Sequence, residues 1–186
     1  PPEVFAAPVA QLSRHASVIA DRFFDTPSAT LRVSGITGTN GKTTTAWLLA
    51  QALTRAGERS AYLGTLGVGI PAEGVVAGEY TTADAVTVQR QLSQMQQLGA
   101  RSAAMEVSSH ALDQARVDGV RFRVAAFTNL TRDHLDYHGS MQAYGEAKAR
   151  LFALPGVTVR VINVDDAFGV TLAERHLAAG ELVLLS

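Results

Sequence analysis

Residues 33–45 constrain the fold of this chain more than any other segment. An apolar, β-branched run at 31–36 leads into the turn Gly38-Thr39-Asn40-Gly41, and a helical pattern follows from Thr43. A strand, a glycine-rich turn and a helix in this order predict a phosphate-binding loop, because the N–H groups of the turn and the positive end of the helix face one anion. Lys42 supplies an ammonium for the outer phosphates, and the hydroxyl of Thr43 can ligate Mg²⁺.

The spacing of this loop departs from the common pattern at one position. That pattern has a glycine five residues before the Gly-Lys pair, where this chain has Ile36. The loop is therefore a shortened variant, Gly38-x-x-Gly41-Lys42-Thr43. A chance Gly-Lys-Thr in a surface loop is the alternative, but the flanking strand and helix patterns favour a nucleotide-phosphate site.

Strand-like and helix-like segments alternate along the chain, which predicts an α/β fold with a doubly wound, mostly parallel sheet. The length of 186 residues, 47% of them apolar, suits one such domain and a short remainder. Strands are expected at 31–36, 60–64, 101–107, 120–127 (as one or two strands), 157–163 and 182–185, and a loop or hairpin at 64–79. Helices are expected at 8–23, 43–56, from Thr82 or Asp84 to Gly99, at 140–154 and at 165–179.

The composition excludes several classes of protein. A net charge of −1 gives no support for binding nucleic acid or an acidic membrane surface. The absence of cysteine rules out disulfides and thiolate metal sites. No apolar run approaches the roughly 20 residues that span a bilayer, and no signal peptide is visible. We therefore expect a cytoplasmic protein, a monomer, that acts on small molecules.

The two lysines are the second unusual feature. Of the 16 basic residues, only Lys42 and Lys148 are lysine, and the other 14 are arginine. A coding bias explains the arginines but not the two exceptions. Lysine differs from arginine in having a compact amine that can lose its proton and be acylated. Because Lys42 belongs to the phosphate loop, Lys148 becomes a candidate functional residue, although most helical lysines are only solvated.

Four polar clusters follow strand ends or loops, at 81–82, 106–110, 128–136 and 163–166. Ligands of doubly wound sheets collect at the carboxyl ends of the strands, so these clusters can share one site. Glu106 ends an apolar strand, where a buried carboxylate is costly without a cation, and we interpret it as a Mg²⁺ ligand together with Thr43. A rim glutamate bonded to a helix N-terminus is the alternative, and the Asp133-His134-x-Asp136 segment on its own can simply organise a turn.

Taken together, these motifs resemble the Mur ligases, specifically the central ATPase domain of the MurE type. The similarity covers residues 27–186. It rests on Gly38-Thr-Asn-Gly-Lys-Thr-Thr44, Thr81-Thr82, Glu106-Val-Ser-Ser-His110, Gln114-x-Arg116, Thr128-Asn-Leu-Thr-Arg-Asp-His-Leu-Asp-Tyr-His-Gly139, Ala147-Lys148 and Asn163-Val-Asp-Asp166. The exact residues in the segments at 106–110 and 133–139 favour the MurE type over the other Mur ligases.

The resemblance assigns roles to individual residues. It implies ATP contacts from Gly38, Thr39, Asn40, Gly41, Lys42, Thr43 and Thr44, and contacts to adenine or ribose from Asn163 and Asp166. It implies Mg²⁺ ions held by Thr43, Glu106 and His134, with Lys148 carbamylated by CO₂ as a further metal ligand. Lys42, Lys148 and His134 would be the catalytic set. Thr81, Thr82, Ser108, Gln114 and Arg116 would contact the muramoyl-dipeptide.

The resemblance also implies a reaction and a domain arrangement. A Mur ligase of this type uses ATP to activate the D-glutamate carboxylate of UDP-MurNAc-L-Ala-D-Glu as an acyl phosphate, which the amine of an amino acid then attacks. On this reading, residues 1–28 are a linker and the tail of an N-terminal domain, and residues 29–186 are the ATP-binding central domain. The amino-acid-binding C-terminal domain would lie outside the chain, and the isolated piece would not turn over.

Two alternatives remain open from the sequence. A folylpolyglutamate synthetase-like ligase shares the phosphate loop and the metal-linked lysine. The other alternative is a P-loop switch protein without ligase activity, such as a regulatory GTPase. Regulatory GTPases read guanine with an Asn-Lys-x-Asp motif, and neither lysine of this chain follows an asparagine.

Overall fold

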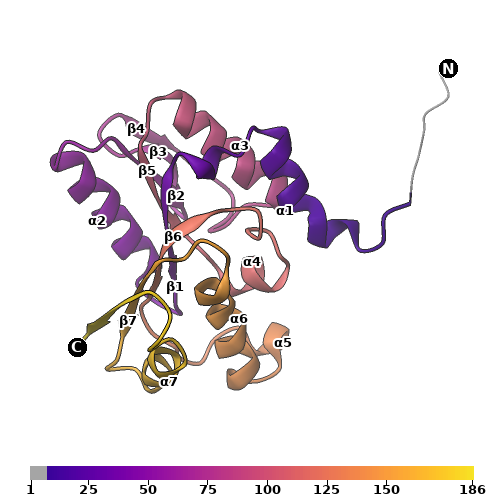
Figure 1. Ribbon diagram of the computed structural model, residues 1–186, viewed down its shortest axis with the longest axis vertical. Helices are drawn as coiled ribbons and strands as arrows, with labels where there is room; N and C mark the ends of the chain where they lie inside the picture. The colour runs from indigo at the N-terminus through magenta and orange to yellow at the C-terminus, as the bar shows by residue number, and fades with distance from the viewer. Residues whose placement is uncertain (1–7) are drawn as a thin grey trace.

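The computed structural model describes residues 8–186, in which one eight-stranded sheet is flanked by helices (Figure 1). The strand order is β4-β3-β2-β5-β1-β6-β7-β8. The six strands from β2 to β8 in this order are parallel, whereas β3 and β4 are antiparallel additions at one edge. The predicted α/β class with a doubly wound, mostly parallel sheet is therefore confirmed.

The elements follow the predicted alternation closely. The strands are β1 Arg32–Thr37, β2 Ser60–Gly64, β3 Gly67–Ile70, β4 Gly74–Val76, β5 Ser102–Glu106, β6 Phe122–Phe127, β7 Val159–Asn163 and β8 Glu181–Leu185. The helices are α1 Leu12–Phe23, the 3₁₀ turn η1 Pro27–Ala29, α2 Lys42–Arg55, α3 Ala85–Gln97, α4 Ser109–Asp113, α5 Leu135–His138, α6 Met141–Ala153 and α7 Ala167–Arg175.

Three details sharpen the sequence prediction. The segment at 64–79, expected to be a loop or hairpin, contains β3 and β4, which extend β2 into an antiparallel meander. Residues 120–127 hold the single strand β6. Asp84 caps α3, because its carboxylate accepts hydrogen bonds from the N–H groups of Val86 and Thr87, each at 3.0 Å. The short helices α4 and α5 were not predicted, since they lie in polar stretches without an apolar period.

The helices cover the two faces of the sheet unequally. Figure 1 shows α2 on one side of the sheet and α3, α4 and α6 on the other. Right-handed crossovers explain this arrangement, because only the β1–α2–β2 connection runs towards β4. Ala46 and Ala50 of α2 are fully buried against Ile36, Tyr62 and Ala104, so small side chains bring this helix close to the central strand.

The larger core lies on the opposite face. Side chains of α3 such as Leu92 pack there with Met105 of β5, Phe122 of β6 and Leu151 of α6. Because β1 lies between β5 and β6, the loops after these three strands meet at one edge of the sheet. This edge is where a doubly wound fold binds its ligands.

The segment before β1 packs on the domain only in part. Helix α1 packs against α3, and the hydroxyl of Ser17 accepts a hydrogen bond from the N–H of Gly119 at 2.9 Å. Its side chains Leu12, Ile19 and Phe23 are exposed. Residues 1–7 of the predicted linker lie outside the described residues, and the predicted division at residue 28 stays a prediction.

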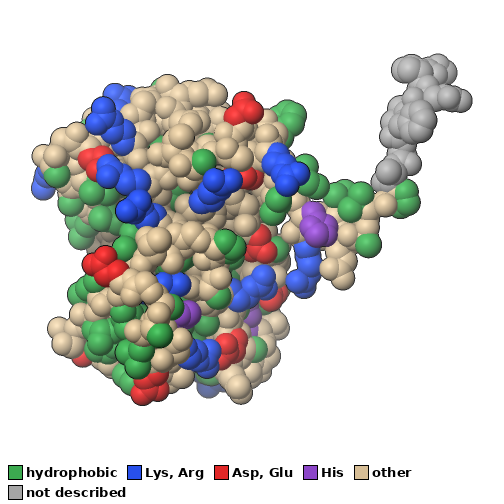
Figure 2. All heavy atoms as spheres, in the orientation of Figure 1, with side chains coloured by type: hydrophobic (Ala, Val, Ile, Leu, Met, Phe, Trp, Pro, Cys, Tyr) green, Lys and Arg blue, Asp and Glu red, His purple; other side chains and the backbone are tan. Residues whose placement is uncertain are grey.

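The charged side chains are mixed in sign on the face of the molecule drawn in Figure 2. Basic and acidic side chains are interspersed there among polar and apolar ones. Within residues 8–186, no helix is long and apolar enough to cross a bilayer.

Gly35 gives a direct test of core packing. A Cβ at this position of β1 would lie 2.8 Å from two ring atoms of Phe122, which is 1% exposed. We expect Gly35→Ala to lower the free energy of unfolding by about 1–3 kcal/mol, because the buried ring has to shift. Urea denaturation measures the change. Gly78→Ala is the matched control, since its nearest neighbour would lie at 3.9 Å, and an equal loss in both variants would contradict the packing explanation.

Candidate nucleotide and metal site

The phosphate loop joins β1 to α2 as predicted. Gly41 occupies the N-cap position of α2 with φ 82°, and Gly38 has φ 149°, so both have backbone angles that favour glycine. The N–H groups in the first turn of α2 have no acceptor within the helix, and together with the helix dipole they form an anion site. The geometry therefore supports the phosphate-binding interpretation of this segment.

Lys42 folds back over this loop. Its ammonium donates hydrogen bonds to the carbonyl oxygens of Gly38 and Thr39, both at 2.9 Å. Burial lowers the pKa of Lys42, while the carboxylates of Glu106 and Asp133 act in the opposite direction. The amine therefore lies against the phosphate loop, and in loops of this kind the lysine reaches the terminal phosphates of a nucleotide.

Glu106 lies beside the start of α2 and is 1% exposed. Its carboxylate accepts hydrogen bonds from the hydroxyl of Thr43 at 2.8 Å, that of Tyr62 at 2.5 Å, and the N–H of Thr65 at 2.8 Å. Burial, and then the hydrogen bond to Glu106, raise the pKa of the Tyr62 hydroxyl, which keeps it a donor. These donors differ from the helix N-terminus that the alternative interpretation required.

The surroundings of Glu106 fit a hard divalent cation. Among the described residues no lysine, arginine or histidine forms an ion pair with this buried carboxylate. Residues 8–186 also contain no group of three histidine, cysteine, aspartate or glutamate side chains that could hold a metal by itself. A carboxylate and a hydroxyl beside a phosphate loop suit Mg²⁺, which keeps several waters and takes its other ligands from phosphate.

Lys148 reaches the same loop from α6. It is 1% exposed, donates a hydrogen bond to the carbonyl oxygen of Gly38 at 2.8 Å, and lies 4.2 Å from the ring centre of Tyr144. The two lysines of the chain thus converge on one oxygen. Burial, and secondly the nearby ammonium of Lys42, lower the pKa of Lys148 to about 7. A large fraction of its amine is therefore neutral near neutral pH, as reaction with CO₂ requires.

His134 is placed differently from the two lysines. It precedes α5 with φ 50°, and its Nε2 lies 3.5 Å from the carboxylate of Asp133. Its ring lies 4.8 Å from that of His110 and 6.0 Å from that of Tyr144. The geometry groups His134 with aromatic rings, and its predicted part in holding Mg²⁺ remains a prediction.

Two further histidines, His110 and His138, join this ring cluster. The ring of His138 packs against Tyr144 at 5.1 Å, and its Nε2 lies 2.9 Å from the hydroxyl of Ser109. Burial lowers the pKa of His138 and of His110. The sequence signals for this cluster were the density of histidine and tyrosine in 134–144 and the polar segment at 106–110.

The residues expected to contact the acceptor lie next to Glu106, but several are engaged in the fold. The hydroxyl of Thr82 donates to the carbonyl oxygen of Glu106 at 2.9 Å and accepts from the N–H of Ser108 at 3.0 Å. Ser108 in turn caps α4. Arg116 donates to the carbonyl oxygen of Thr82 at 3.1 Å and to the side chain of Gln114 at 2.8 Å. Thr81 is linked to the same carboxylate through Thr65, whose hydroxyl donates to that of Thr81 at 3.0 Å and whose N–H donates to Glu106.

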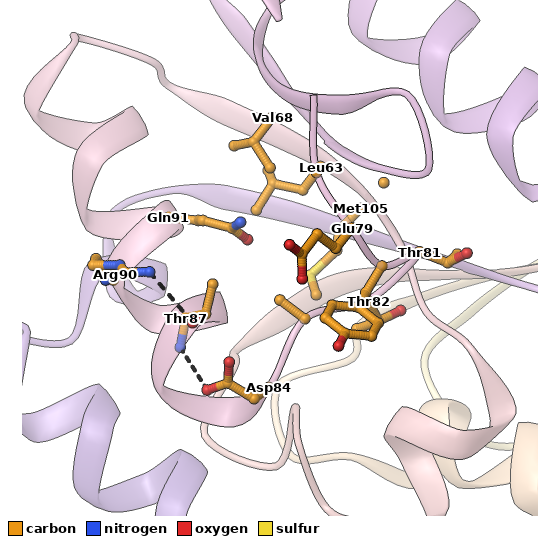
Figure 3. Close-up of a pocket in the computed structure, with 14 residues that line it drawn as sticks. Leu63, Val68, Glu79, Thr81, Thr82, Asp84, Thr87, Arg90, Gln91 and Met105 are labelled. Carbon is orange, nitrogen blue, oxygen red and sulfur yellow. Dashed lines mark hydrogen bonds between the residues drawn. The ribbon is translucent and has the colours of Figure 1, made fainter. Parts of the chain in front are cut away.

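A cavity of about 270 Å³ opens beside Thr82 (Figure 3). Leu63 and Met105 form an apolar wall at the ends of β2 and β5, and the side chains of Glu79 and Gln91 point into the cavity. Sequence reasoning singled out only Thr81 and Thr82 of its lining.

Asn163 and Asp166 contact the loop that follows β6. Asn163 donates to the carbonyl oxygen of Thr128 at 2.7 Å, and the carboxylate of Asp166 accepts from the N–H of Leu130 at 2.7 Å. Both side chains therefore bind the loop at 128–131, and their predicted contacts to adenine or ribose stay predictions.

Comparison with known proteins agrees with this geometry. A sequence model of the Mur ligase middle domain matches residues 36–183. The UDP-N-acetylmuramoyl-L-alanyl-D-glutamate–2,6-diaminopimelate ligase of Ectopseudomonas mendocina is 56% identical over 168 residues, which are 90% of this chain and 34% of that protein. The ligase of the same name from Pseudomonas aeruginosa is 54% identical over 162 residues, 87% of this chain and 33% of that one. The chain thus spans about a third of the length of these relatives.

Solved structures show the same relationship. A structure of a UDP-N-acetylmuramoyl-L-alanyl-D-glutamate–2,6-diaminopimelate ligase superposes with a TM-score of 0.83 at 36% identity, covering 96% of this chain and 37% of that one. Folylpolyglutamate synthase from Mycobacterium tuberculosis, complexed with ADP, reaches a TM-score of 0.72 at 16% identity over 95% of this chain and 47% of that one. The second likeness shows a shared fold alone.

Lys148 should make the stability of the chain depend on pH. Its pKa is 10.5 in the unfolded chain and about 7 in the folded chain, so between these values the unfolded chain binds more protons at this amine. The free energy of unfolding should therefore rise, relative to Lys148→Met, as the pH increases through this window. Urea denaturation of both proteins in CO₂-free buffer measures the difference. A difference that stays constant with pH would show that Lys148 keeps an ordinary pKa.

Proposed function

The chain belongs to the Mur ligase family, whose middle domain it contains, and from this premise we propose that it is the ATP-binding part of a MurE-type ligase. The complete enzyme would add 2,6-diaminopimelate, the amino acid in the names of these two relatives, to UDP-MurNAc-L-Ala-D-Glu. This is a step of peptidoglycan synthesis on a soluble sugar nucleotide, for which we propose a cytoplasmic monomer. Identities above 50% over most of the chain support this subtype.

One observation carries the proposal: both lysines meet at the carbonyl oxygen of Gly38, on a loop whose helix begins beside the Thr43–Glu106 pair. Activation of the substrate brings an anionic carboxylate to an anionic phosphate, so the site has to supply positive charge. Lys42 provides that charge, and the first turn of α2 adds N–H groups aimed at the phosphates. Bound Mg²⁺ would neutralise phosphate charge, with Thr43 and Glu106 as its ligands from this chain.

The remaining residues would bind the substrates and orient them for the two steps of the reaction. The γ-carboxylate of the D-glutamate would attack the γ-phosphorus of ATP, so that ADP leaves and an acyl phosphate forms. Attack by the amine of the amino acid then forms the amide and releases phosphate. We assign the acceptor side to Thr81, Thr82, Ser108, Gln114 and Arg116, of which Arg116 carries the positive charge. His134 would assist a second metal ion.

Lys148 would act after reaction with CO₂. Its neutral amine forms an N–C bond to CO₂ and releases a proton, which leaves an anionic carbamate on the side chain. The low pKa that burial gives this lysine supports the reaction, because only the neutral amine is a nucleophile. The carbamate would hold a metal in place rather than transfer a proton.

The alternatives are less well supported. The likeness to folylpolyglutamate synthase rests on 16% identity and extends only to the fold. A P-loop switch without ligase activity does not account for Lys148, which is buried against the phosphate loop instead of being exposed on its helix.

Nucleotide binding by this chain is the first test. We expect Lys42→Met to weaken MgADP binding by roughly 10- to 100-fold, because a hydrogen bond to a charged group contributes about 1.5–3 kcal/mol. Glu106→Gln should lower the affinity for MgADP but not for ADP in EDTA. Isothermal titration calorimetry measures both effects, with Arg55→Met at the far end of α2 as the control. Equal binding by all the variants would refute the site.

Ligation is the second test. We expect no amide formation by the 186-residue chain alone, since the chain covers about a third of its relatives. A polypeptide extended to the full length of those relatives should release phosphate with UDP-MurNAc-L-Ala-D-Glu and diaminopimelate but not with a folate and glutamate. In that protein Lys148→Ala should abolish turnover, with rescue by a small added carboxylate and not by bicarbonate. Folate-dependent turnover would favour the alternative ligase.

A further inference from the structure

The phosphate loop is held by another loop more than by its own helix. Residues 128–131, which follow β6, bind the backbone of Thr39 and Asn40 at four points. The N–H of Thr39 donates to the carbonyl oxygen of Asn129 at 2.8 Å, and the N–H of Asn40 donates to the Asn129 side chain at 3.0 Å. The carbonyl oxygen of Asn40 accepts from the hydroxyl of Thr128 at 2.6 Å and from the Asn129 amide at 3.2 Å.

These bonds change what Thr39 and Asn40 can do. Their N–H groups are already paired with Asn129, so they are not free to bind a phosphate oxygen. The donors left for the anion are those at the start of α2. The contact is also close, because a Cβ on Gly38 would lie 1.9 Å from the hydroxyl oxygen of Thr128. The conformation of the turn therefore depends on where residues 128–131 lie.

Residues 128–131 are held in turn from the end of β7. One carboxylate oxygen of Asp166 caps α7 through the N–H groups of Phe168 at 2.9 Å and Gly169 at 3.2 Å. The other accepts from the N–H of Leu130 at 2.7 Å, and Asn163 donates to the carbonyl oxygen of Thr128 at 2.7 Å. The start of α7 lies tightly on β7, since a Cβ on Gly169 would lie 1.9 Å from the carbonyl oxygen of Asn163.

We propose that Asp166 and Asn163 are positioning residues for the phosphates, acting through residues 128–131 on the phosphate loop. Two sets of hydrogen bonds connect the end of β7 to Thr39 and Asn40: Asn163 and Asp166 bind residues 128–131, which bind the turn. Gly38, next in the chain, carries the oxygen that both lysines use. Asp166 thus acts on the phosphate end of a nucleotide. This inference rests on the proposed nucleotide site, but it differs from the adenine or ribose contact that the sequence suggested for these residues.

Asp166→Asn separates this role from helix capping. Asparagine caps a helix about as well as aspartate, so the oxygen that serves Phe168 and Gly169 is retained. The amide nitrogen then faces the N–H of Leu130, donor against donor, and the link to residues 128–131 is lost. Asp165→Asn makes the same chemical change at an exposed neighbouring side chain and is the matched control.

Hydrogen exchange measures the connection between Asp166 and the phosphate loop in the absence of any ligand. In Asp166→Asn and in Asn129→Ala, we expect the amides of Thr39 and Asn40 to lose protection, whereas amides in the middle of β1 keep it. Unchanged protection of Thr39 and Asn40 in Asp166→Asn would overturn the proposal. Because no nucleotide is present, this result does not depend on whether the proposed function is right.

Calorimetry with inorganic tripolyphosphate and Mg²⁺ measures the effect on phosphate binding. This probe has neither base nor ribose, so it reports on phosphate contacts alone. We expect Asp166→Asn to weaken its binding about tenfold, as loss of a hydrogen bond at a charged site does, and to weaken MgADP binding equally. Asn129→Ala should have a similar effect, and the double variant should lose little more, because both changes break one pathway. Weaker ADP binding with unchanged tripolyphosphate binding would instead establish a nucleoside contact and overturn the proposal. If the unaltered chain binds neither probe, the proposed function fails and the exchange result alone decides the link.

Discussion

The carbonyl oxygen of Gly38 accepts hydrogen bonds from both lysines of the chain, and the arrangement of the site depends on this shared contact. Two ammonium groups on one oxygen in a buried place would repel each other strongly. The conflict is relieved because burial and Lys42 lower the pKa of Lys148 to about 7, so one amine can be neutral while the other keeps its charge. Packing therefore places an amine that can lose its proton next to a second, charged amine.

The backbone around this contact is shaped to admit it. A Cβ on Gly64 at the end of β2 would lie 2.1 Å from a carboxylate oxygen of Glu106, so a glycine is needed to make room for the acid. Gly38 makes room in the same way for Thr128. Ala46 and Ala50 let α2 lie close to the sheet, which brings Thr43 within hydrogen-bonding distance of Glu106. Small residues on three elements thus set the positions of the charged ones.

Local patterns predicted the fold class and nearly every long element, because periodicity and glycine turns act over a few residues. They also predicted that Glu106 lies near the phosphate loop, since strand ends of a doubly wound sheet share one edge. The place of Lys148 at this site came from the resemblance to the Mur ligases. What they could not reveal were partners distant in sequence. The hydroxyl of Thr82 serves Glu106 and Ser108, and Asp166 serves Leu130 across 36 residues, so side chains that a motif presents as ligand contacts are engaged inside the protein. The short helices α4 and α5 were missed because helices of five and four residues are too short to show a period.

The charge balance of the site explains why metal and nucleotide belong together in the proposed reaction. With Lys148 neutral, the charges of Lys42 and Glu106 roughly cancel, and a triphosphate added to this place brings several negative charges that one ammonium cannot offset. A carbamate on Lys148 would add one more negative charge. In the proposed reaction, ATP and a second anion would therefore need divalent cations to lie close together, and the oxygen donors here, a carboxylate beside a hydroxyl, are those that such cations prefer.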